Sequence, residues 1–245
     1  MSLAARLGHL LYKVAFPIYR PLYAFYKTRS DAFELAQLRE HVRPGDVVLD
    51  IGANIGFYSR ILSDLVGPNG KVHCFEPDRQ NFHHLEEAAR GLSNLTINFK
   101  AVAPSSGKLK IYTSKSYNVD HRTYEPEQYD QAIEIDAISM DDYIGDGRVD
   151  FIKMDIQGFE MEAVRGMEGV LARNPNIKIL SEFWPYGLRK AGSSTSAYYR
   201  YLSDRGFGCY LLKDNSLARL SEADAVKLDS LGQASYFNLF ARRQG

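Results

Sequence analysis

The sequence lacks the features that mark several specialised classes of protein. Its 245 residues include only two cysteines, Cys74 and Cys209, too few for a disulfide framework, and it has no C-x-x-C pair for zinc. Lysine and arginine together number 30, as do aspartate and glutamate. This balance excludes the global basic field that nucleic-acid-binding proteins use, so we expect no nucleic-acid partner.

Long apolar runs and a secretion signal are also missing. No window approaches the ~18 consecutive apolar residues of a transmembrane helix. Charged residues break the apolar stretches near the N-terminus, unlike those of a signal peptide. We therefore expect a cytoplasmic protein. The composition, 45% hydrophobic and 24% charged, is typical of a globular protein with a substantial core.

The first 30 residues differ in charge from the rest of the chain. They hold five basic residues and no acidic one, whereas residues 31–245 hold 25 basic and 30 acidic residues. Residues 3–16 have leucines at helical spacing, and Pro17 and Pro21 are expected to interrupt this amphipathic helix. We interpret residues 1–30 as a basic, aromatic extension and residues 31–245 as the main domain. The extension has three alternative roles: packing across the domain, peripheral contact with the inner surface of an anionic membrane, or binding a partner.

Beyond the extension, strand-like apolar runs alternate with helix-like amphipathic stretches. This alternation predicts βαβ units, and hence an α/β fold with a mostly parallel sheet and helices on both faces. Residues 207–213 and 235–241 could form a C-terminal β-hairpin, and the aperiodic residues 114–131 predict a loop over the site. The other strands are expected at 46–51, 71–76, 95–99, 107–113, 133–136, 149–155 and 176–183, and helices at 31–42, 55–66, 78–91, 139–144, 158–172 and 194–205.

Residues 47–57, Val-Val-Leu-Asp-Ile-Gly-Ala-Asn-Ile-Gly-Phe, carry the most informative pattern. An apolar run ends in Asp50, a glycine turn follows, and a helix then begins, which is how open α/β folds hold a nucleotide-like ligand. The dinucleotide fingerprint G-x-G-x-x-G is absent because Asn54 occupies its middle glycine position. An acid before the turn, with no Walker lysine after it, favours a cationic or amino-acid-bearing ligand. S-adenosylmethionine (SAM) is such a ligand.

An acidic residue also ends the second predicted strand of this unit. Glu76 lies 26 residues after Asp50, and an acid at this point can accept hydrogen bonds from both ribose hydroxyls of a nucleotide-like ligand. The alternative is that Glu76 is only a cap. Pro77 then turns the chain, and Asp78 is placed to cap the next helix.

Four segments, in order along the chain, share one resemblance. They are residues 50–59, 75–77, 150–160 and 179–182, which read D-I-G-A-N-I-G-F-Y-S, F-E-P, D-F-I-K-M-D-I-Q-G-F-E and I-L-S-E. Together they resemble the motifs of class I SAM-dependent methyltransferases, in the form typical of the FkbM family. The resemblance implies a Rossmann-like SAM-methyltransferase fold with a mostly parallel seven-stranded sheet, and it makes residues 31–245 the methyltransferase domain.

The resemblance also implies which residues bind SAM. One departure from the family pattern is the segment Ala103-Pro104-Ser105-Ser106, which stands where many members have a short Asp/Gly turn and which weakens the match at the adenine-contacting wall. The expected SAM-binding residues are Asp50, Gly52, Ala53, Asn54, Gly56, Phe57, Tyr58, Ser59, Glu76, Pro77, Ala101, Val102 and Asp155.

Three carboxylates are expected to face one cleft. Asp155 and Glu182 end neighbouring strands and Glu160 opens a helix, so all three meet at the carboxyl edge of the sheet. Such a cluster can raise one pKa and make a general base, or it can collect a divalent cation. No histidine completes a ligand set, so no metal site is predicted. Alternatively, Glu160 caps its helix and Glu182 pairs with a lysine. His121, in the predicted loop, is a further candidate base.

These features predict an enzyme, a SAM-dependent O-methyltransferase. The resemblance implies that its acceptor is a hydroxyl of a sugar, a glycolipid or a secondary metabolite. One alternative is an NAD-dependent oxidoreductase on the same fold, which Asn54 and the lack of a Tyr-x-x-x-Lys pair disfavour. The other is a non-catalytic module that binds a membrane or a partner, which the basic residues within 1–29 suggest.

Overall fold

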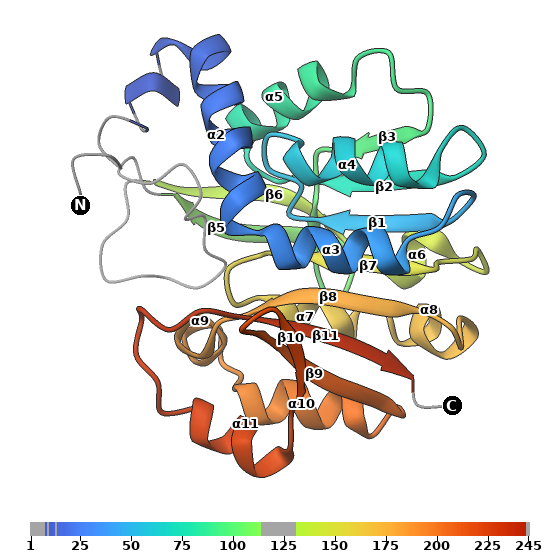
Figure 1. Cartoon of the computed structure of the whole chain (residues 1–245), viewed down its shortest axis with the longest axis vertical. Coiled ribbons are helices and arrows are strands. Elements are labelled where there is room, and N and C mark those ends of the chain that lie inside the picture. Colours follow the sequence, from blue (N-terminus) through green and yellow to red (C-terminus); the bar gives the residue numbers. More distant parts are fainter. Residues whose placement is uncertain (1–7, 9, 13, 114–130, 244–245) are drawn as a thin grey trace.

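The computed structural model describes residues 8, 10–12, 14–113 and 131–243. Its main feature is an eight-stranded sheet with the strand order β10-β9-β11-β8-β7-β1-β2-β3 (Figure 1). Neighbours from β3 to β8 are parallel, whereas β11, β9 and β10 pair antiparallel. This confirms the predicted mostly parallel α/β sheet. Its strands are β1 (Val47–Ile51), β2 (Lys71–Phe75), β3 (Leu95–Asn98), β7 (Phe151–Met154), β8 (Lys178–Phe183), β9 (Phe207–Lys213), β10 (Ser216–Arg219) and β11 (Phe237–Arg243).

Helices cover both faces of the sheet because successive strand side chains point to opposite sides. In β1, Val48 packs into one hydrophobic cluster and Leu49 into another. The face of Val48 is covered by α3 (Ala32–His41), α4 (Phe57–Val66) and α5 (Arg79–Ala89). The face of Leu49 is covered by α6 (Met140–Ile144), α7 (Glu160–Arg165), α8 (Glu168–Arg173), α9 (Pro185–Lys190), α10 (Thr195–Ser203) and α11 (Glu222–Leu228).

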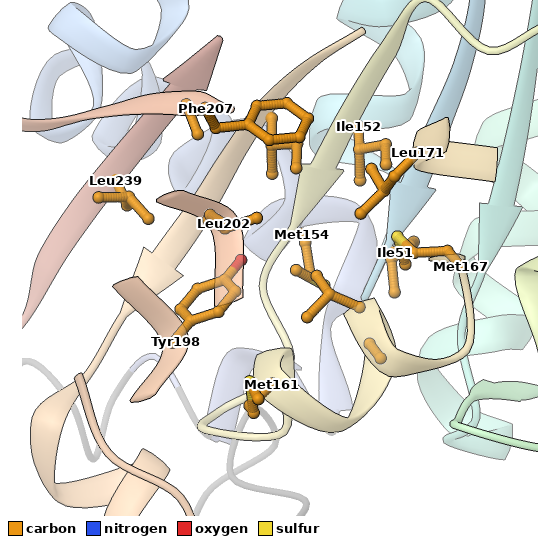
Figure 2. Packing of buried hydrophobic residues seen from close by; sticks show 14 of the residues in the cluster. Ile51, Ile152, Met154, Met161, Met167, Leu171, Tyr198, Leu202, Phe207 and Leu239 are labelled. Carbon is orange, nitrogen blue, oxygen red and sulfur yellow. The ribbon is translucent and has the colours of Figure 1, made fainter. Parts of the chain in front are cut away.

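The larger core joins the C-terminal strands to the centre of the sheet. Figure 2 shows Tyr198 and Leu202 of α10 between Leu239 of β11 and Met154 of β7. All four side chains are at most 1% exposed. This packing fixes β8, which lies between β7 and β11, and with it the acidic residue Glu182 near its end.

The predicted count of seven strands is wrong by one. Residues 216–219 form β10, a short edge strand whose residues Ser-Leu-Ala-Arg have little strand-forming character. A tight turn over Asp214 and Asn215, both with positive φ, joins β9 to β10 in a hairpin. The expected pairing of 207–213 with 235–241 is present as β9 and β11, but β10 and α11 lie between them in the chain.

Three further strands form a separate small sheet with the order β4-β6-β5. They are β4 (Ala101–Val102), β5 (Gly107–Thr113) and β6 (Gln131–Ile138). The predicted strands 107–113 and 133–136 therefore exist, outside the main sheet. The predicted loop lies outside the described residues, except for residue 131, which begins β6.

The expected helix over 158–172 is divided in two at Gly166. A Cβ built on this glycine would lie 2.1 Å from the carbonyl oxygen of Ala103. The chain segment after β4 thus passes directly against the end of α7. A continuous helix is replaced by α7 and α8, which meet at this close approach.

The extension forms a helix that the sequence did not predict, beyond the one expected over residues 3–16. Residue Ala15 breaks the helical conformation, and α2 (Phe16–Ser30) then begins with Pro17 in its first turn. The expectation that Pro21 interrupts the helix is wrong, because α2 runs on through Pro21 to Ser30. A search of the described residues finds no helix long and apolar enough to cross a membrane.

Candidate active site

The strand order changes direction at β1, which has β2 and β3 on one side and β7 and β8 on the other. Open α/β sheets bind their ligands outside the carboxyl ends of the strands at this point. Here a cavity of about 320 Å³ is lined by residues at the ends of β1, β2, β7 and β8 and by the glycine turn. Its volume is in the range of small-molecule sites.

The glycine turn packs directly against the end of β7. A Cβ on Gly52, which has φ +80°, would lie 2.0 Å from the carbonyl oxygen of Asp155. Only glycine fits at this position. Gly56, with φ +82°, instead faces α5, where a Cβ would meet the side chain of Ala88 at 2.7 Å. Asn54 also has positive φ, and its side-chain oxygen accepts a hydrogen bond from the backbone N–H of Ile55 (2.7 Å).

Asp50 lies beneath the turn and does not line the cavity. It is fully buried, and its Oδ2 accepts a hydrogen bond from the hydroxyl of Ser59 (2.6 Å). Its Oδ1 lies 3.8 Å from Nζ of Lys153. Burial raises the pKa of Asp50, while the ammonium of Lys153 and the Ser59 hydrogen bond oppose that shift. Asp50 and Ser59 therefore support the turn from below.

Glu76 lines the cavity and is tied to the turn. It is 5% exposed, and its two oxygens accept hydrogen bonds from the backbone N–H groups of Asn54 (2.8 Å) and Asp78 (2.9 Å). Burial raises the pKa of Glu76 to about 7 against the effect of these hydrogen bonds. As predicted, Asp78 caps α5 by accepting from the backbone N–H of Asn81 (2.8 Å).

The small sheet supplies the opposite wall. Ala101 and Val102, at most 7% exposed, line the cavity from β4. Lys100 and Phe159, which the sequence did not suggest, line it as well. The other predicted SAM-binding residues that line this cavity are Gly52, Ala53, Asn54, Phe57, Tyr58, Glu76, Pro77 and Asp155.

Asp155 and Glu182 lie side by side at the edge of the sheet. The side-chain nitrogen of Gln157 donates to Oδ1 of Asp155 (3.1 Å) and to Oε1 of Glu182 (3.3 Å). Within the described chain, Oε2 of Glu182 has no hydrogen-bond partner. Burial, Asp155 and Glu160 together raise the pKa of Glu182 well above its usual range, although Lys153 and Lys27 act in the opposite direction.

Lys153 brings a buried cation to these carboxylates. Its side chain is 8% exposed, and its Nζ lies 3.9 Å from Oδ2 of Asp155. The same Nζ lies 4.6 Å from the centre of the Tyr58 ring, a cation–π contact. It is thus held between Asp50 below the turn and Asp155 at the cavity.

Glu160 lies outside the cavity, although the sequence groups it with the other carboxylates. It is fully buried, and its Oε1 accepts hydrogen bonds from the backbone N–H groups of Ile156 (3.1 Å) and Gly158 (3.3 Å). Burial raises the pKa of Glu160 to about 7. The carboxylate therefore binds the loop before α7, which carries Gln157; the N-cap of α7 is Phe159, which makes no side-chain cap.

A second cavity of about 150 Å³ adjoins the first. Both are lined by Lys27, Tyr58, Lys153, Asp155 and Glu182. The second has additional polar walls, and the side chains that supply them are Asp31, Glu34 and Asn238. The acidic pair therefore lies where the two cavities meet.

The extension helix contributes to this junction, which the sequence did not reveal. Tyr23 and Lys27 of α2 line the first cavity. Lys27 forms an ion pair with Asp31, whose Oδ2 also accepts a hydrogen bond from the hydroxyl of Tyr58 (2.6 Å). Of the alternatives for the extension, packing across the domain is thus observed for this part of it. Helical spacing gave no signal for these contacts, because both faces of α2 are apolar or aromatic.

Two sequence-based expectations concern His121 and a metal site. His121 lies outside the described residues. Among the residues that the structure describes, no group of three or more histidine, cysteine, aspartate or glutamate side chains could hold a metal ion.

Comparisons with known proteins agree with this geometry. The family model of the methyltransferase FkbM domain matches residues 50–209. A search of curated proteins finds no significant match.

Solved structures show the same fold. An rRNA methylase from Streptococcus thermophilus is 12% identical, with 87% of this chain and 95% of that chain covered and a TM-score of 0.50. For a precorrin-6y C5,15-methyltransferase from Geobacter metallireducens the identity is 16%, both coverages are 87% and the TM-score is 0.50. For a Streptococcus mutans protein in complex with SAH the identity is 10%, the coverages are 86% and 95% and the TM-score is 0.50.

At these identities the solved structures establish only the Rossmann-like methyltransferase fold. The match to the family model shows the family. It covers the glycine turn, Glu76, the segment Asp150–Glu160 and Glu182. The match also favours methyl transfer over NAD-dependent oxidation. The chain therefore belongs to the FkbM family of class I SAM-dependent methyltransferases.

Proposed function

We propose that the protein transfers the methyl group of SAM to a hydroxyl of a sugar, a glycolipid or a secondary metabolite. The observation that carries this proposal is the position of Asp155 and Glu182 at the junction of two cavities. One cavity has the features of a SAM site, and the other offers an adjoining space with polar walls. A carboxylate between donor and acceptor is what the methylation of a hydroxyl needs, because the hydroxyl must lose its proton.

The residues of the first cavity fit SAM. Glu76 is an acceptor-only group in its charged form, and the backbone N–H groups of Asn54 and Asp78, with the Asn81 side chain, fill only part of its capacity. It can therefore accept a hydrogen bond from a ribose hydroxyl. The absence of a side chain at Gly52 lets the turn pack against the Asp155 carbonyl, and Ala101 and Val102 give the adenine an apolar wall.

Three of the predicted SAM-binding residues have a different proposed role. Asp50 and Ser59 hold the turn from below, and Gly56 allows the start of α4 to pack against α5. We assign these residues to the shape of the turn. Tyr58, Phe57, Ala53 and Pro77 stay proposed contacts of the ligand.

Glu182 is the proposed general base. When bound, SAM supplies an electrophilic methyl group, and the protein must remove the proton of the acceptor hydroxyl. A carboxylate whose pKa is raised toward the working pH accepts a proton more effectively than an ordinary one. Burial and the neighbouring acids raise the pKa of Glu182 well above its usual range. Gln157 fixes its Oε1, and the buried Oε2 has no hydrogen-bond partner among the described residues.

Asp155 and Glu160 have supporting roles in this proposal. Asp155 lines both cavities and is held by Gln157 and Lys153, so it can orient the acceptor or the amino-acid part of SAM. Glu160 acts as a positioning residue, through the loop that carries Gln157. A role for His121 as a base stays a prediction.

The second cavity favours an acceptor rich in hydroxyl groups. Its walls include Asp31, Glu34 and Asn238, and the side-chain nitrogen of Asn238 donates to Oε1 of Glu34 (2.5 Å). Carboxylates and amides can accept from and donate to several hydroxyls at once. A sugar ring presents such groups in number, whereas a flat apolar metabolite would use none of the hydrogen-bonding capacity that these walls have beyond their own contacts.

The test uses SAM with a labelled methyl group and parallel acceptor mixtures: glycans, glycolipids, small phenolic and aliphatic alcohols, and rRNA. We expect label on a hydroxyl, identified as a methyl ether by mass spectrometry. Label on a nitrogen or carbon atom, or on rRNA alone, would contradict O-methylation while leaving SAM-dependent transfer intact. The control is Glu182→Gln, which should bind SAM like the wild type and transfer far less label.

A further inference from the structure

The outer face of α2 is apolar and exposed. Ile18, Leu22, Phe25 and Tyr26 are 57%, 54%, 60% and 65% exposed, respectively. Ile18, Leu22 and Phe25 are three or four residues apart, and Tyr26 is four after Leu22, so all four lie on one side of the helix. No residue of α2 is buried. Figure 1 shows this helix at the periphery of the molecule.

The exposed apolar residues continue upstream. Leu10 and Val14 are 54% and 71% exposed, and they lie before the break at Ala15. We call Ile18, Leu22, Phe25 and Tyr26 the α2 stripe. It holds four of the eight exposed large hydrophobic side chains in the described part of the chain, and Leu10 and Val14 are two more. Single exposed apolar residues are ordinary, but a contiguous row marks a binding surface.

The inner face of the extension is already occupied. The hydroxyl of Tyr12 donates to Oδ1 of Asn81 (2.7 Å), the ring of Phe16 stacks on His84, and the ring of Tyr23 meets Phe57 edge-on. The domain therefore holds the extension by its aromatic inner side. The α2 stripe is presented outwards by a helix that has its own anchors.

Two arginines of α2 lie near the stripe, and the first 30 residues hold no acidic residue. The other basic residue of α2, Lys27, lies on the opposite side in its ion pair with Asp31. In α2, the Arg29 guanidinium lies 4.3 Å from the centre of the Phe25 ring, within the stripe. Arg20 lines a groove of about 370 Å³ between α2 and α4, together with Arg60 and Asp64. An apolar row with basic neighbours matches the surface of an anionic bilayer.

We infer that the α2 stripe docks the protein on an anionic lipid bilayer, with α2 lying in the plane of the interface. A second copy of the chain is a poorer occupant, because a two-fold contact through this face would bring the two basic segments together. Tyr23 and Lys27, on the other side of α2, line the candidate SAM cavity. A docked helix would therefore hold that cavity close to the membrane surface.

The test is co-sedimentation of the full chain with vesicles of phosphatidylcholine alone, or of phosphatidylcholine and phosphatidylglycerol in a two-to-one ratio. We expect binding to the second kind, loss of that binding at high salt, and little binding to the first. This readout needs neither SAM nor an acceptor, so its failure would leave the proposed function standing. Failure of methyl transfer would equally leave this inference standing.

Substitutions separate the apolar and the basic contributions. Leu22→Ser combined with Phe25→Ser should weaken partitioning at least about tenfold, because two side chains no longer enter the bilayer. Arg29→Gln should weaken it about fivefold, the effect expected for one basic residue near the surface. Val226→Ser is the matched apolar control, since Val226 is 48% exposed on α11, and Arg219→Gln is the basic one.

Each outcome decides the question. Reduced binding in the stripe and Arg29 variants, with both controls at the wild-type level, supports docking on the bilayer. A wild-type protein that binds neither vesicle overturns it. So does undiminished binding of the Leu22→Ser, Phe25→Ser protein. A dimer that light scattering detects and that the same pair of substitutions dissolves, without vesicle binding, overturns it in favour of self-association. Circular dichroism and SAM titration check that each variant is folded.

Discussion

Replacing Glu76 by alanine should weaken SAM binding without unfolding the domain. The carboxylate is 5% exposed and lines the cavity. Its two oxygens accept hydrogen bonds from the backbone N–H groups of Asn54 and Asp78. The Asn81 side chain also hydrogen-bonds this carboxylate. A carboxylate offers roughly four lone-pair sites, so about one is left for a ribose hydroxyl.

The magnitude follows from the groups left without partners. In Glu76→Ala a ribose hydroxyl loses its acceptor, and a buried polar group without a partner costs about 1–3 kcal/mol. The dissociation constant of SAM should therefore rise by a factor of roughly 5 to 150. Glu76→Gln keeps one acceptor oxygen and should fall between the alanine variant and the wild type.

The assay is calorimetric titration with SAM, with circular dichroism to verify folding. Glu86→Ala is the matched control, because Glu86 lies on α5, its side chain is 52% exposed and it does not line the cavity. The dissociation constant of SAM for this variant should equal that for the wild type. If the Glu76→Ala protein is folded and binds SAM with the wild-type dissociation constant, the ribose of SAM does not bind at Glu76.

Three further predictions concern the base, the turn and the buried acid of α7. Glu182→Gln should lower turnover by about 10²–10⁴ with little change in SAM affinity, measured with labelled SAM once an acceptor is known; unchanged turnover would remove Glu182 as the base. Gly52→Ala should lower the unfolding free energy by about 2–5 kcal/mol, because of backbone strain and overlap with the Asp155 carbonyl. Gly45→Ala is the control: Gly45 also has positive φ but has open space around it, so this variant should lose only the strain energy. Equal losses for the two variants in urea denaturation would contradict the steric argument. The pKa of Glu160 is raised from 4.5 to about 7. As the pH rises through this interval, the wild type should therefore lose stability relative to Glu160→Gln, because a buried carboxylate must then ionise. A difference in melting temperature between the two proteins that does not vary with pH would contradict this prediction.

The motifs of the nucleotide-binding half could be predicted because local chemistry dictates them. The turn from Asp50 to Gly56 needs glycines where the backbone is left-handed or touches another strand, and Asp78 needs only its own helix to act as a cap. These requirements are visible in the order of the residues alone. The alternation of strands and helices gave the α/β class for the same reason.

The features that the sequence did not predict depend on contacts that form only in the folded chain. The break at Gly166 depends on the backbone of Ala103, far away in the chain. Glu160 was grouped with Asp155 and Glu182 because all three follow one sheet edge, but it turns back onto its own loop. Gln157, between the two remaining acids, is a neutral residue that no charge pattern would select.

The extension was the least predictable part of the site. Tyr23 and Lys27 reach the cavity because α2 is anchored to the domain by aromatic contacts spread over several elements. A helix that is apolar or aromatic on both sides carries no periodic signal to say which side faces inwards. The spacing of the residues in the α2 stripe can be interpreted only when the structure shows which side of α2 packs against the domain.

Titration of the wild-type protein with SAM and, separately, with NAD tests the central claim most directly. The claim is that the cavity at the carboxyl ends of β1, β2 and β7 is a SAM site. We predict a saturable heat with SAM at one site per chain, displacement of SAM by SAH, and no heat with NAD. A folded sample that gives no heat with SAM, or that binds NAD in its place, would contradict the account.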